Sequence, residues 1–447
     1  MKFKKILIAN RGEIAVRILR TCKEMGIETV CVHSTADESS LHVKLADESV
    51  CIGKPKASLS YLNIPSILSA AEITGAQAIH PGFGFLSENK EFADLCRKWD
   101  LEFIGPSIDC IEKMGDKIIS KKLAKKAGLP ILESIEINKK SDSEILKACK
   151  NLGYPVLIKA SAGGGGRGMK AIWKEEELLT SIERLKKEAK AGFNDDTLFI
   201  EKYITRPRHI EVQIIADHFG NVIHLGERDC TIQRRFQKVL EESPCPILKD
   251  EKRQEVLDAA VELAKFVDYD SVGTVEFLYD QDDDKFYFIE MNTRIQVEHP
   301  VTEQRTGVDL IAQQIKIAQN EKLEFDQKDI VFTGHAMECR LNAEDPFTGA
   351  PSAGKILYYH RPAGIGVRVD DFIYSGYDVP PYYDSMLAKI IVQAPTRELC
   401  LDRMKRALDE AVIEGIKTNK ELHLKILEHP KFRGNNYATS FLNTHLQ

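Results

Sequence analysis

The sequence predicts several domains, in which a doubly wound α/β domain is joined to further α/β and α+β parts. Short apolar runs alternate with helical patterns through the first third, a glycine-rich loop separates two strands near the middle, and antiparallel β patterns fill much of the rest. The 447 residues exceed one ordinary hydrophobic core. With 43% apolar and 29% charged residues, the chain has the composition of a folded, water-soluble protein.

The first third is expected to form a parallel sheet with helices on both faces. Residues 5–9 are an apolar run, and Ile14, Ile18 and Cys22 then follow helical spacing up to Gly26, which can cap the helix. Further strands are expected at residues 28–33, 78–80 and 103–105. This alternation of strand and helix is typical of a doubly wound fold.

The pattern changes after a basic helical stretch over residues 108–128. A small α/β unit is expected over residues 131–203, with strands at 156–160 and 169–173 and a helix at 175–190. Antiparallel strands are expected at 209–216, 273–279 and 286–291, with a hairpin turn at 281–285. Beyond residue 328 the expected elements are strands at 335–341 and 367–370 and a final helix from Arg397.

Composition argues against several classes of protein. A net charge of −6 speaks against a nucleic-acid binder, and we expect no membrane partner because no apolar run approaches the length of a membrane span. The ten cysteines contain no CxxC pair, so a zinc ribbon is not indicated. Single buried cysteines are typical of a reducing compartment, and the basic N-terminus lacks a signal-peptide core. We therefore expect a cytoplasmic protein.

A glycine loop follows the strand at residues 156–160. Four consecutive glycines, Gly163–Gly166, allow backbone N–H groups to close over phosphate oxygens, and Lys159 stands at the strand end. The GK[ST] ending of a P-loop is missing, so a flexible flap over a nucleotide fits better. A mobile surface loop with a solvated lysine is the alternative.

Two carboxylates lie inside apolar strands of one predicted hairpin. Glu276 stands in Val-Gly-Thr-Val-Glu-Phe-Leu and Glu290 in Phe-Tyr-Phe-Ile-Glu-Met-Asn. A carboxylate in such a strand is costly unless it is paired or binds metal. With Asn292 they form an oxygen set suited to Mg²⁺ on nucleotide phosphates; the alternative is that each pairs with a buried Lys or Arg.

The following segment places a cation, an amide and a carboxylate close together. Arg294, Gln296 and Glu298 alternate, so an extended chain would aim them at one spot. We interpret this as an anionic substrate held by Arg294 and deprotonated by Glu298, and the alternative is a solvated turn with ordinary ion pairs. Cys230 reads as a buried structural thiol rather than a nucleophile.

These motifs, with others, resemble the biotin carboxylases, the ATP-grasp subunit or domain of biotin-dependent carboxylases. The residues that carry the resemblance are 8–14 (IANRGEI), 80–89 (HPGFGFLSEN), 114–117 (MGDK), 163–168 (GGGGRG), 227–230 (ERDC), 290–300 (EMNTRIQVEHP) and 380–386 (PPYYDSM). The resemblance implies a pre-ATP-grasp domain over residues 1–112, an ATP-grasp domain over 113–328 with a mobile lid at about 131–203, and a C-terminal biotin carboxylase domain over 329–447. It also implies that ATP and Mg²⁺ (or Mn²⁺) activate bicarbonate to carboxyphosphate, and that biotin is then carboxylated.

The resemblance assigns a role to each matching position. The residues implied to bind the nucleotide are Lys117, Lys159, Gly165, Gly166, Glu201, Lys202, Tyr203, Ile204, His209, Gln233 and Phe236. The implied metal ligands are Glu276, Glu290 and Asn292. Bicarbonate is implied to contact Lys238, Arg294, Gln296, Val297 and the base Glu298, and biotin to contact Arg340 and Phe83. Of these, Arg294, Glu298, Lys238 and Arg340 are implied to be catalytic.

Two positions depart from the family pattern. Phe236 stands where His is common, so one polar nucleotide contact is lost or replaced by stacking. Phe83 stands where Tyr is usual, so a hydroxyl near the biotin ring is missing. We still expect activity, because the metal and bicarbonate sets are complete.

Partners follow from the same resemblance. An Ala-Met-Lys-Met biotinylation site is missing, so biotin is expected on a separate carrier protein, with carboxyltransferase subunits handling the acceptor. A homodimer is expected, and Arg20, Glu24 and Arg368 match interface positions. Acetyl-CoA carboxylase, and so fatty acid synthesis, is the default. The alternatives are a two-chain pyruvate or other acyl-CoA carboxylase, another ATP-grasp enzyme such as a carbamoyl-phosphate synthetase or a purine-pathway ligase, and a scaffold that has lost catalysis.

Overall fold

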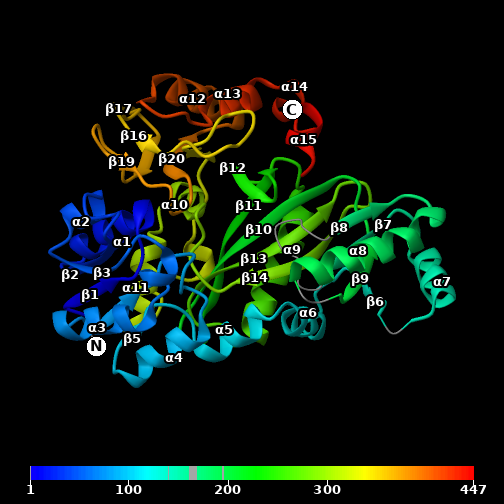
Figure 1. The fold of residues 1–447 in the computed structure, drawn as a ribbon, viewed down its shortest axis with the longest axis horizontal. Helices are drawn as coiled ribbons and strands as arrows, with labels where there is room; N and C mark the ends of the chain where they lie inside the picture. The colour runs from blue at the N-terminus through cyan, green and yellow to red at the C-terminus, as the bar shows by residue number, and fades with distance from the viewer. Residues whose placement is uncertain (1, 139, 161–168, 194–195, 447) are drawn as a thin grey trace.

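The structure, a computed structural model, describes residues 2–138, 140–160, 169–193 and 196–446 (Figure 1). Three sheets of more than two strands organise these residues. Within the described ranges, no helix is long and apolar enough to cross a membrane.

The N-terminal sheet is parallel, with the strand order β3-β2-β1-β4-β5. Its strands are β1 Lys5–Ile8, β2 Glu28–Ser34, β3 Glu48–Gly53, β4 Ala78–His80 and β5 Glu102–Phe103. The connecting helices are α1 Gly12–Glu24, α2 Leu41–Leu45, α3 Ile64–Thr74 and α4 Lys90–Lys98, with a 3₁₀ turn at Ala57–Leu59. Ile6 and Ile8 enter one apolar cluster with α1, whereas Leu7 enters another with α3 and α4. Both sheet faces are therefore covered, which confirms the doubly wound prediction.

A second, smaller unit follows α5 Ile108–Gly115 and α6 Lys117–Lys126. Its sheet has the order β6-β9-β7-β8, with β6 Ser134–Glu136, β7 Val156–Ala160, β8 Met169–Ile172 and β9 Leu198–Lys202. The helices α7 Asp142–Leu152 and α8 Leu178–Phe193 accompany it, with a 3₁₀ turn at Glu175–Glu177. The unit has its own apolar core and lies at the end of the molecule opposite the N-terminal sheet (Figure 1). Gly165 and Gly166 of the expected flap lie outside the described residues.

The largest sheet has eight strands in the order β14-β13-β10-β11-β12-β15-β20-β18. Its strands are β10 Pro207–Ala216, β11 Val222–Arg234, β12 Gln237–Ser243, β13 Val272–Asp280, β14 Lys285–Asn292, β15 His335–Asn342, β18 Val367–Asp371 and β20 Met386–Ala394. The expected hairpin of β13 and β14 is confirmed. The pairing of β12 with β15 carries the sheet across residue 328, where the sequence suggested a boundary.

Helices cover this sheet at several points. α9 Asp250–Phe266 packs on β10 and β11, and α12 Arg397–Glu410 packs on β15 and β20. α10 His299–Thr306 and α11 Leu310–Ala318 follow residues 293–298, before a 3₁₀ turn at Gln327–Asp329. The helix from Arg397 is not the final one, because α13 Lys420–Glu428, α14 Pro430–Arg433 and α15 Phe441–His445 follow it. Two short antiparallel pairs complete the C-terminal region: β16 Gly354–Lys355 with β19 Asp378–Val379, and β17 Tyr358–His360 with β21 Val412–Glu414.

Candidate active site

Three carboxylates stand side by side on neighbouring strands of the large sheet. Glu211 of β10 is directly opposite Glu276 of β13, which is directly opposite Glu290 of β14. Asn292, at the end of β14, donates to Oε1 of Glu276 at 2.9 Å. Directly opposed side chains on antiparallel strands lie about 5 Å apart at Cβ, so these groups form one acidic row.

A single lysine joins this row to the next part of the site. Lys238 of β12 donates to Glu211, to Oε1 of Glu276 at 2.8 Å and to Oε1 of Glu298 at 2.7 Å. Arg228 holds the other oxygen of Glu211 at 2.6 Å. The alternative weighed from the sequence, a carboxylate paired with a buried cation, therefore describes Glu276 in this structure. This pairing is compatible with a metal site, because Glu290 stands directly opposite Glu276 and offers further carboxylate oxygens.

The opposed carboxylates Glu276 and Glu290 repel each other when both are ionised. Burial raises the pKa of Glu290, and the facing Glu276 carboxylate raises it further. Burial also opposes ionisation of Glu276, but Lys238 and His209 outweigh it and hold the pKa of Glu276 low. A divalent cation between the two carboxylates would relieve their repulsion. The oxygens of Glu276, Glu290 and Asn292 fit a hard cation such as Mg²⁺.

His209 stands closer to the acidic row than its expected nucleotide role suggested. Its Nε2 lies 3.0 Å from Oε2 of Glu276, and its Nδ1 lies 3.1 Å from Nε2 of Gln233. Burial lowers the pKa of His209, but Glu276 outweighs this and raises it. One ligand-type atom from each of His209, Glu211 and Glu276 lies within 4.8 Å of the others.

Residues 293–298 are not extended, so the expectation of simple alternation is wrong. The segment bends and turns into α10, while Ile295 is fully buried. Arg294 still donates to Oε1 of Gln296 at 3.1 Å, and Gln296 donates to Glu276 at 3.3 Å. Arg294 also donates to Oδ1 of Asn292 at 3.0 Å. The arginine and the amide therefore reach the acidic row by a turn rather than by strand geometry.

Glu298 is fully buried and held by two cations. Oε1 accepts from Lys238 at 2.7 Å and Oε2 accepts from Arg340 at 2.9 Å. Burial opposes its ionisation, but Lys238, Arg340 and Arg228 outweigh it and keep its pKa well below the usual range. Glu298 is thus ionised, which is the protonation state that a general base requires. Cys230 is buried beside it, and burial raises the pKa of that thiol, which confirms a structural thiol.

The remaining nucleotide-type residues gather where the smaller unit meets the large sheet. Glu201 of β9 accepts from Lys159 of β7 and, at 2.8 Å, from Lys121 of α6. Lys117 begins α6 and is exposed. The three residues after Glu201 differ in surroundings: Lys202 donates to Gly153 O, Tyr203 packs edge-on against Trp173, and Ile204 is buried.

Phe236 lies in the two-residue turn between β11 and β12. Arg235 and Phe236 have φ values of 50° and 66°, which is the left-handed region. Such turns favour Asn and Gly, so a Phe here is strained. Its side chain is 59% exposed and therefore free to contact a ligand.

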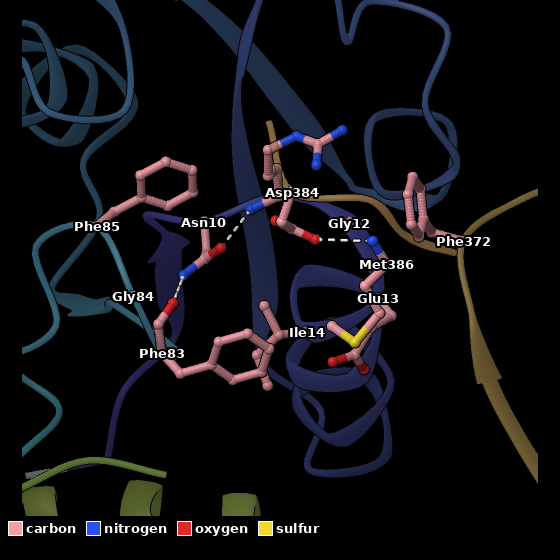
Figure 2. Close-up of a pocket in the computed structure, with 11 residues that line it drawn as sticks. Asn10, Gly12, Glu13, Ile14, Phe83, Gly84, Phe85, Phe372, Asp384 and Met386 are labelled. Atoms are coloured by element: carbon pink, nitrogen blue, oxygen red, sulfur yellow. Dashed lines mark hydrogen bonds between the residues drawn. The ribbon is translucent and has the colours of Figure 1, made fainter. Parts of the chain in front are cut away.

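Phe83 lines a cavity of about 170 Å³ between the N-terminal domain and the C-terminal region. Figure 2 shows its ring beside Ile14, while its carbonyl accepts from Asn10. Asp384 and Phe372 approach the same cavity from the C-terminal region. Phe83 thus lies between the N-terminal domain and the C-terminal region, in a cavity whose lining residues include none of the acidic row.

Four residues that complete the site are not among those predicted from the sequence. Glu211 carries the same signal as Glu276, a carboxylate in an apolar alternating strand (His-Ile-Glu-Val-Gln), and could have been found. Glu241, which holds Arg340, lies in the similar run Val-Leu-Glu-Glu-Ser. Glu88, which holds Arg294 at 2.9 Å, and Lys121 carry no local signal that distinguishes them from surface charges.

The doubly wound domain, the small α/β unit over a large antiparallel sheet, and the lysine–carboxylate site together define an ATP-dependent ligase. Three family models match the chain: Biotin carboxylase, N-terminal domain, over residues 2–111; Carbamoyl-phosphate synthase L chain, ATP binding domain, over 116–326; and Biotin carboxylase C-terminal domain, over 338–444. The chain therefore belongs to the biotin carboxylase family, and it is a ligase that carboxylates biotin.

Relatives match over nearly the whole chain. Biotin carboxylase 1 of Bacillus subtilis is 54% identical over 99% of this chain and 98% of its own length. A pyruvate carboxylase subunit of Methanothermobacter thermautotrophicus is 52% identical over 99% of this chain and 90% of its own. Among solved structures, a biotin carboxylase complex from Campylobacter jejuni has a TM-score of 0.93 at 49% identity, covering 99% of both chains. The biotin carboxylase domain dimer of Hydrogenobacter thermophilus 2-oxoglutarate carboxylase, with MgADP, ADP and bicarbonate, has a TM-score of 0.92 at 48% identity, covering 100% of this chain and 98% of its own.

Proposed function

We propose that this chain performs the first half-reaction of a biotin-dependent carboxylase, through carboxyphosphate, on biotin carried by a separate protein. The observation that supports this most is the position of Lys238. Its ammonium contacts both Glu276 of the acidic row and Glu298, 2.8 and 2.7 Å away. A phosphate over the acidic row and a bicarbonate at Glu298 would therefore meet at one cation.

ATP would bind between the smaller unit and the acidic row. Lys117 and Lys159 would contact the phosphates, and residues 201–204 with His209 and Gln233 would form the base and ribose side. Glu276, Glu290 and Asn292 would hold Mg²⁺, which when bound neutralises phosphate charge. Phe236 is exposed at the rim, where its ring can stack on the nucleotide but cannot hydrogen-bond to it.

Bicarbonate would bind between Arg294 and Glu298. Lys238, Arg294 and Gln296 offer donors, and Val297 can contribute only its backbone N–H because its side chain is apolar. Glu298 would take the bicarbonate proton, and the deprotonated bicarbonate oxygen would attack the γ-phosphorus of ATP. The bond between the γ-phosphorus and the bridging oxygen would break, and that oxygen would leave with ADP. Arg294 and Lys238 would stabilise the charge that develops.

Biotin would bind beyond Glu298, at Arg340. Cleavage of carboxyphosphate would give CO₂ and phosphate, the released phosphate would take the proton of the ureido N–H, and the deprotonated nitrogen would then attack CO₂. The Arg340 guanidinium would stabilise the enolate form of the ureido group, in reach of Glu298 at 2.9 Å. Phe83 would lie near the biotin ring without a hydroxyl to offer.

The wider assembly follows the relatives. We propose a homodimer, as in the solved 2-oxoglutarate carboxylase domain dimer. Arg368 donates to Glu303 and Asp370 of its own chain, so Arg20 and Glu24 are the freer of the matched interface residues. Acetyl-CoA carboxylase is the proposed complex, with a carrier protein and carboxyltransferase subunits as partners. Pyruvate carboxylase is the second candidate complex, because a pyruvate carboxylase subunit is similar to this chain over almost its whole length. Ten free cysteines support a cytoplasmic location.

The test measures ADP and carboxybiotin formation by purified protein with ATP, Mg²⁺, bicarbonate and free biotin. We expect both products to depend on bicarbonate and biotin. Arg294→Ala should lower kcat by about 100-fold or more while ATP affinity stays within about threefold. Arg206→Ala, at an exposed pair with Asp282, is the matched arginine control. Wild-type protein without carboxybiotin formation would overturn the proposal, and the biotinylated protein that co-purifies would identify the complex.

A further inference from the structure

A second group of buried charges lies at Arg340, where β12 pairs with β15. Arg340 of β15 donates through Nε to Oε1 of Glu241 at 2.7 Å and through Nη2 to Oε2 of Glu298 at 2.9 Å. Two carboxylates therefore hold one guanidinium, one from β12 and one from the start of α10. The proposed enolate contact depends on how firmly Glu241 fixes this arginine.

Glu338 is the unexplained member of this group. It stands directly opposite Glu241 across β12 and β15, and it is fully buried. Both of its carboxyl oxygens, and Oε2 of Glu241, lack a hydrogen-bond partner among the described residues. Directly opposed side chains have Cβ atoms about 4.5–5.5 Å apart, so the two carboxyl groups can meet.

The nearby cations are already engaged. Lys389 of β20, directly opposite Arg340, donates to Val297 O at 2.8 Å and lies 3.1 Å from Glu13 of α1. Asp370 of β18 pairs with Arg368. The charged and titratable groups around Glu338 are thus Glu241, Arg340, Glu298 and Lys389, with Glu13, Asp370, Arg368 and His299 beyond Lys389. In this set Glu338 has no cation of its own.

Two buried carboxylates at this spacing repel each other unless a proton lies between them. We propose that Glu338 is a neutral carboxylic acid that donates a hydrogen bond to Oε2 of Glu241, and that this shared-proton pair is the positioning device for Arg340. The arrangement satisfies Oε2 of Glu241 and one oxygen of Glu338, and it leaves Oε1 of Glu241 charged toward Arg340. Burial, which raises the pKa of Glu338 well above its usual value and that of Glu241 to about 7, agrees with it.

The inference rests on the proposed function for its catalytic consequence. Loss of the shared proton at alkaline pH would set two anions against each other and loosen Glu241 from Arg340. Turnover should then fall as the pH rises, through this pair rather than through substrate binding. An amide at position 338 keeps the N–H donor and cannot ionise, whereas an alkyl group removes the donor.

The variants Glu338→Gln and Glu338→Leu test this by the pH profile of kcat with free biotin. We expect Glu338→Leu to lose about tenfold or more in kcat near neutral pH with little change in KM for ATP. Glu338→Gln should recover most of that loss and should lack the alkaline fall of the wild type. Equal losses in both variants, or an unchanged alkaline midpoint in Glu338→Gln, would overturn the proposal.

An infrared difference spectrum between wild type and Glu338→Gln, without substrates, reads the proton directly. We expect the wild type to show a protonated-carboxyl carbonyl band that the variant lacks. The matched control is Glu242→Gln. Glu242 follows Glu241 on β12, but it is also buried and pairs with Arg397 and His335 instead of Arg340. The control variant should lose stability but keep both the band and the alkaline midpoint. A missing wild-type band refutes the inference even where turnover is normal, and an inactive wild type refutes only the proposed function.

Discussion

Replacing Lys238 by methionine removes a cation that contacts both the acidic row and the candidate base. The side chain is 12% exposed, and its ammonium contacts three buried carboxylates, Glu211, Glu276 and Glu298. Methionine has similar length and volume but no charge. The variant therefore isolates the electrostatic role of the lysine from its packing.

The size of the effect follows from the contacts that remain. Removing one partner of a buried ion pair costs about 3–5 kcal/mol. Each carboxylate keeps another partner, because Arg228 holds Glu211, His209 lies at Glu276 and Arg340 holds Glu298. We therefore expect the lower end, about 3 kcal/mol of unfolding free energy. Turnover should fall by about 100-fold, or about 2.7 kcal/mol of barrier, because in the proposed mechanism Lys238 would also stabilise the developing anion.

Thermal denaturation and bicarbonate-dependent ADP formation measure the two effects separately. Mg²⁺–ADP should restore part of the lost thermal stability in Lys238→Met, because a metal at Glu276 and Glu290 supplies a positive charge. Arg397→Met is the matched control: it breaks a buried pair with Glu242, 2.7 Å away, outside the site. It should lower thermal stability without lowering turnover at a permissive temperature. Turnover of folded Lys238→Met within threefold of wild type would refute the assigned role.

Three further changes have separate readouts. Phe236→His should lower KM for ATP by about 2–10-fold by adding one hydrogen bond, and an unchanged KM would contradict a nucleotide contact. Glu88→Ala should lower kcat/KM for bicarbonate by only about threefold, because Glu88 is 38% exposed, and should leave KM for ATP unchanged. Burial lowers the pKa of His42 to about 4 from 6.5, so the stability it contributes is present above pH 6.5 and is lost as pH falls toward 4. That loss is up to about 3 kcal/mol, and His42→Asn should flatten the fall of Tm over this window.

Much of the site could be predicted because its signals are local. Glu276 and Glu290 interrupt apolar strands joined by a polar turn, so the hairpin follows from the sequence. That the two carboxylates face each other depends on a β-bulge beside Glu276, which shifts the register by one residue. Glu211 carries the same signal, a carboxylate within an apolar strand. The local pattern therefore predicts a carboxylate within each of the three strands, but not that the three stand opposite one another.

Other features depend on contacts that no local pattern encodes. Residues 293–298 read as extended, but burial of Ile295 and the start of α10 turn the chain instead. The contact of Glu241 with Arg340 requires β12 to pair with β15, almost a hundred residues further on. Partner strands of such separation are chosen by the packing of the whole sheet. Phe236 and Phe83 differ from the family pattern in the sequence itself. The left-handed turn that holds Phe236 and the cavity that Phe83 lines depend on the folded structure.

The continuous sheet explains why the two half-sites are joined at Glu298. Lys238 lies on β12 and Arg340 on the adjacent β15, so the lysine of the proposed bicarbonate site and the arginine of the proposed biotin site reach one carboxylate from neighbouring strands. If β15 belonged to a separately moving domain, Glu298 would lose one of its two cations whenever that domain shifted. Burial without that cation would raise the pKa of Glu298 and weaken its ionised form. The eight-stranded sheet thus keeps Glu298, the proposed base, ionised before a substrate binds, because it makes a strand of the C-terminal region part of the candidate active site.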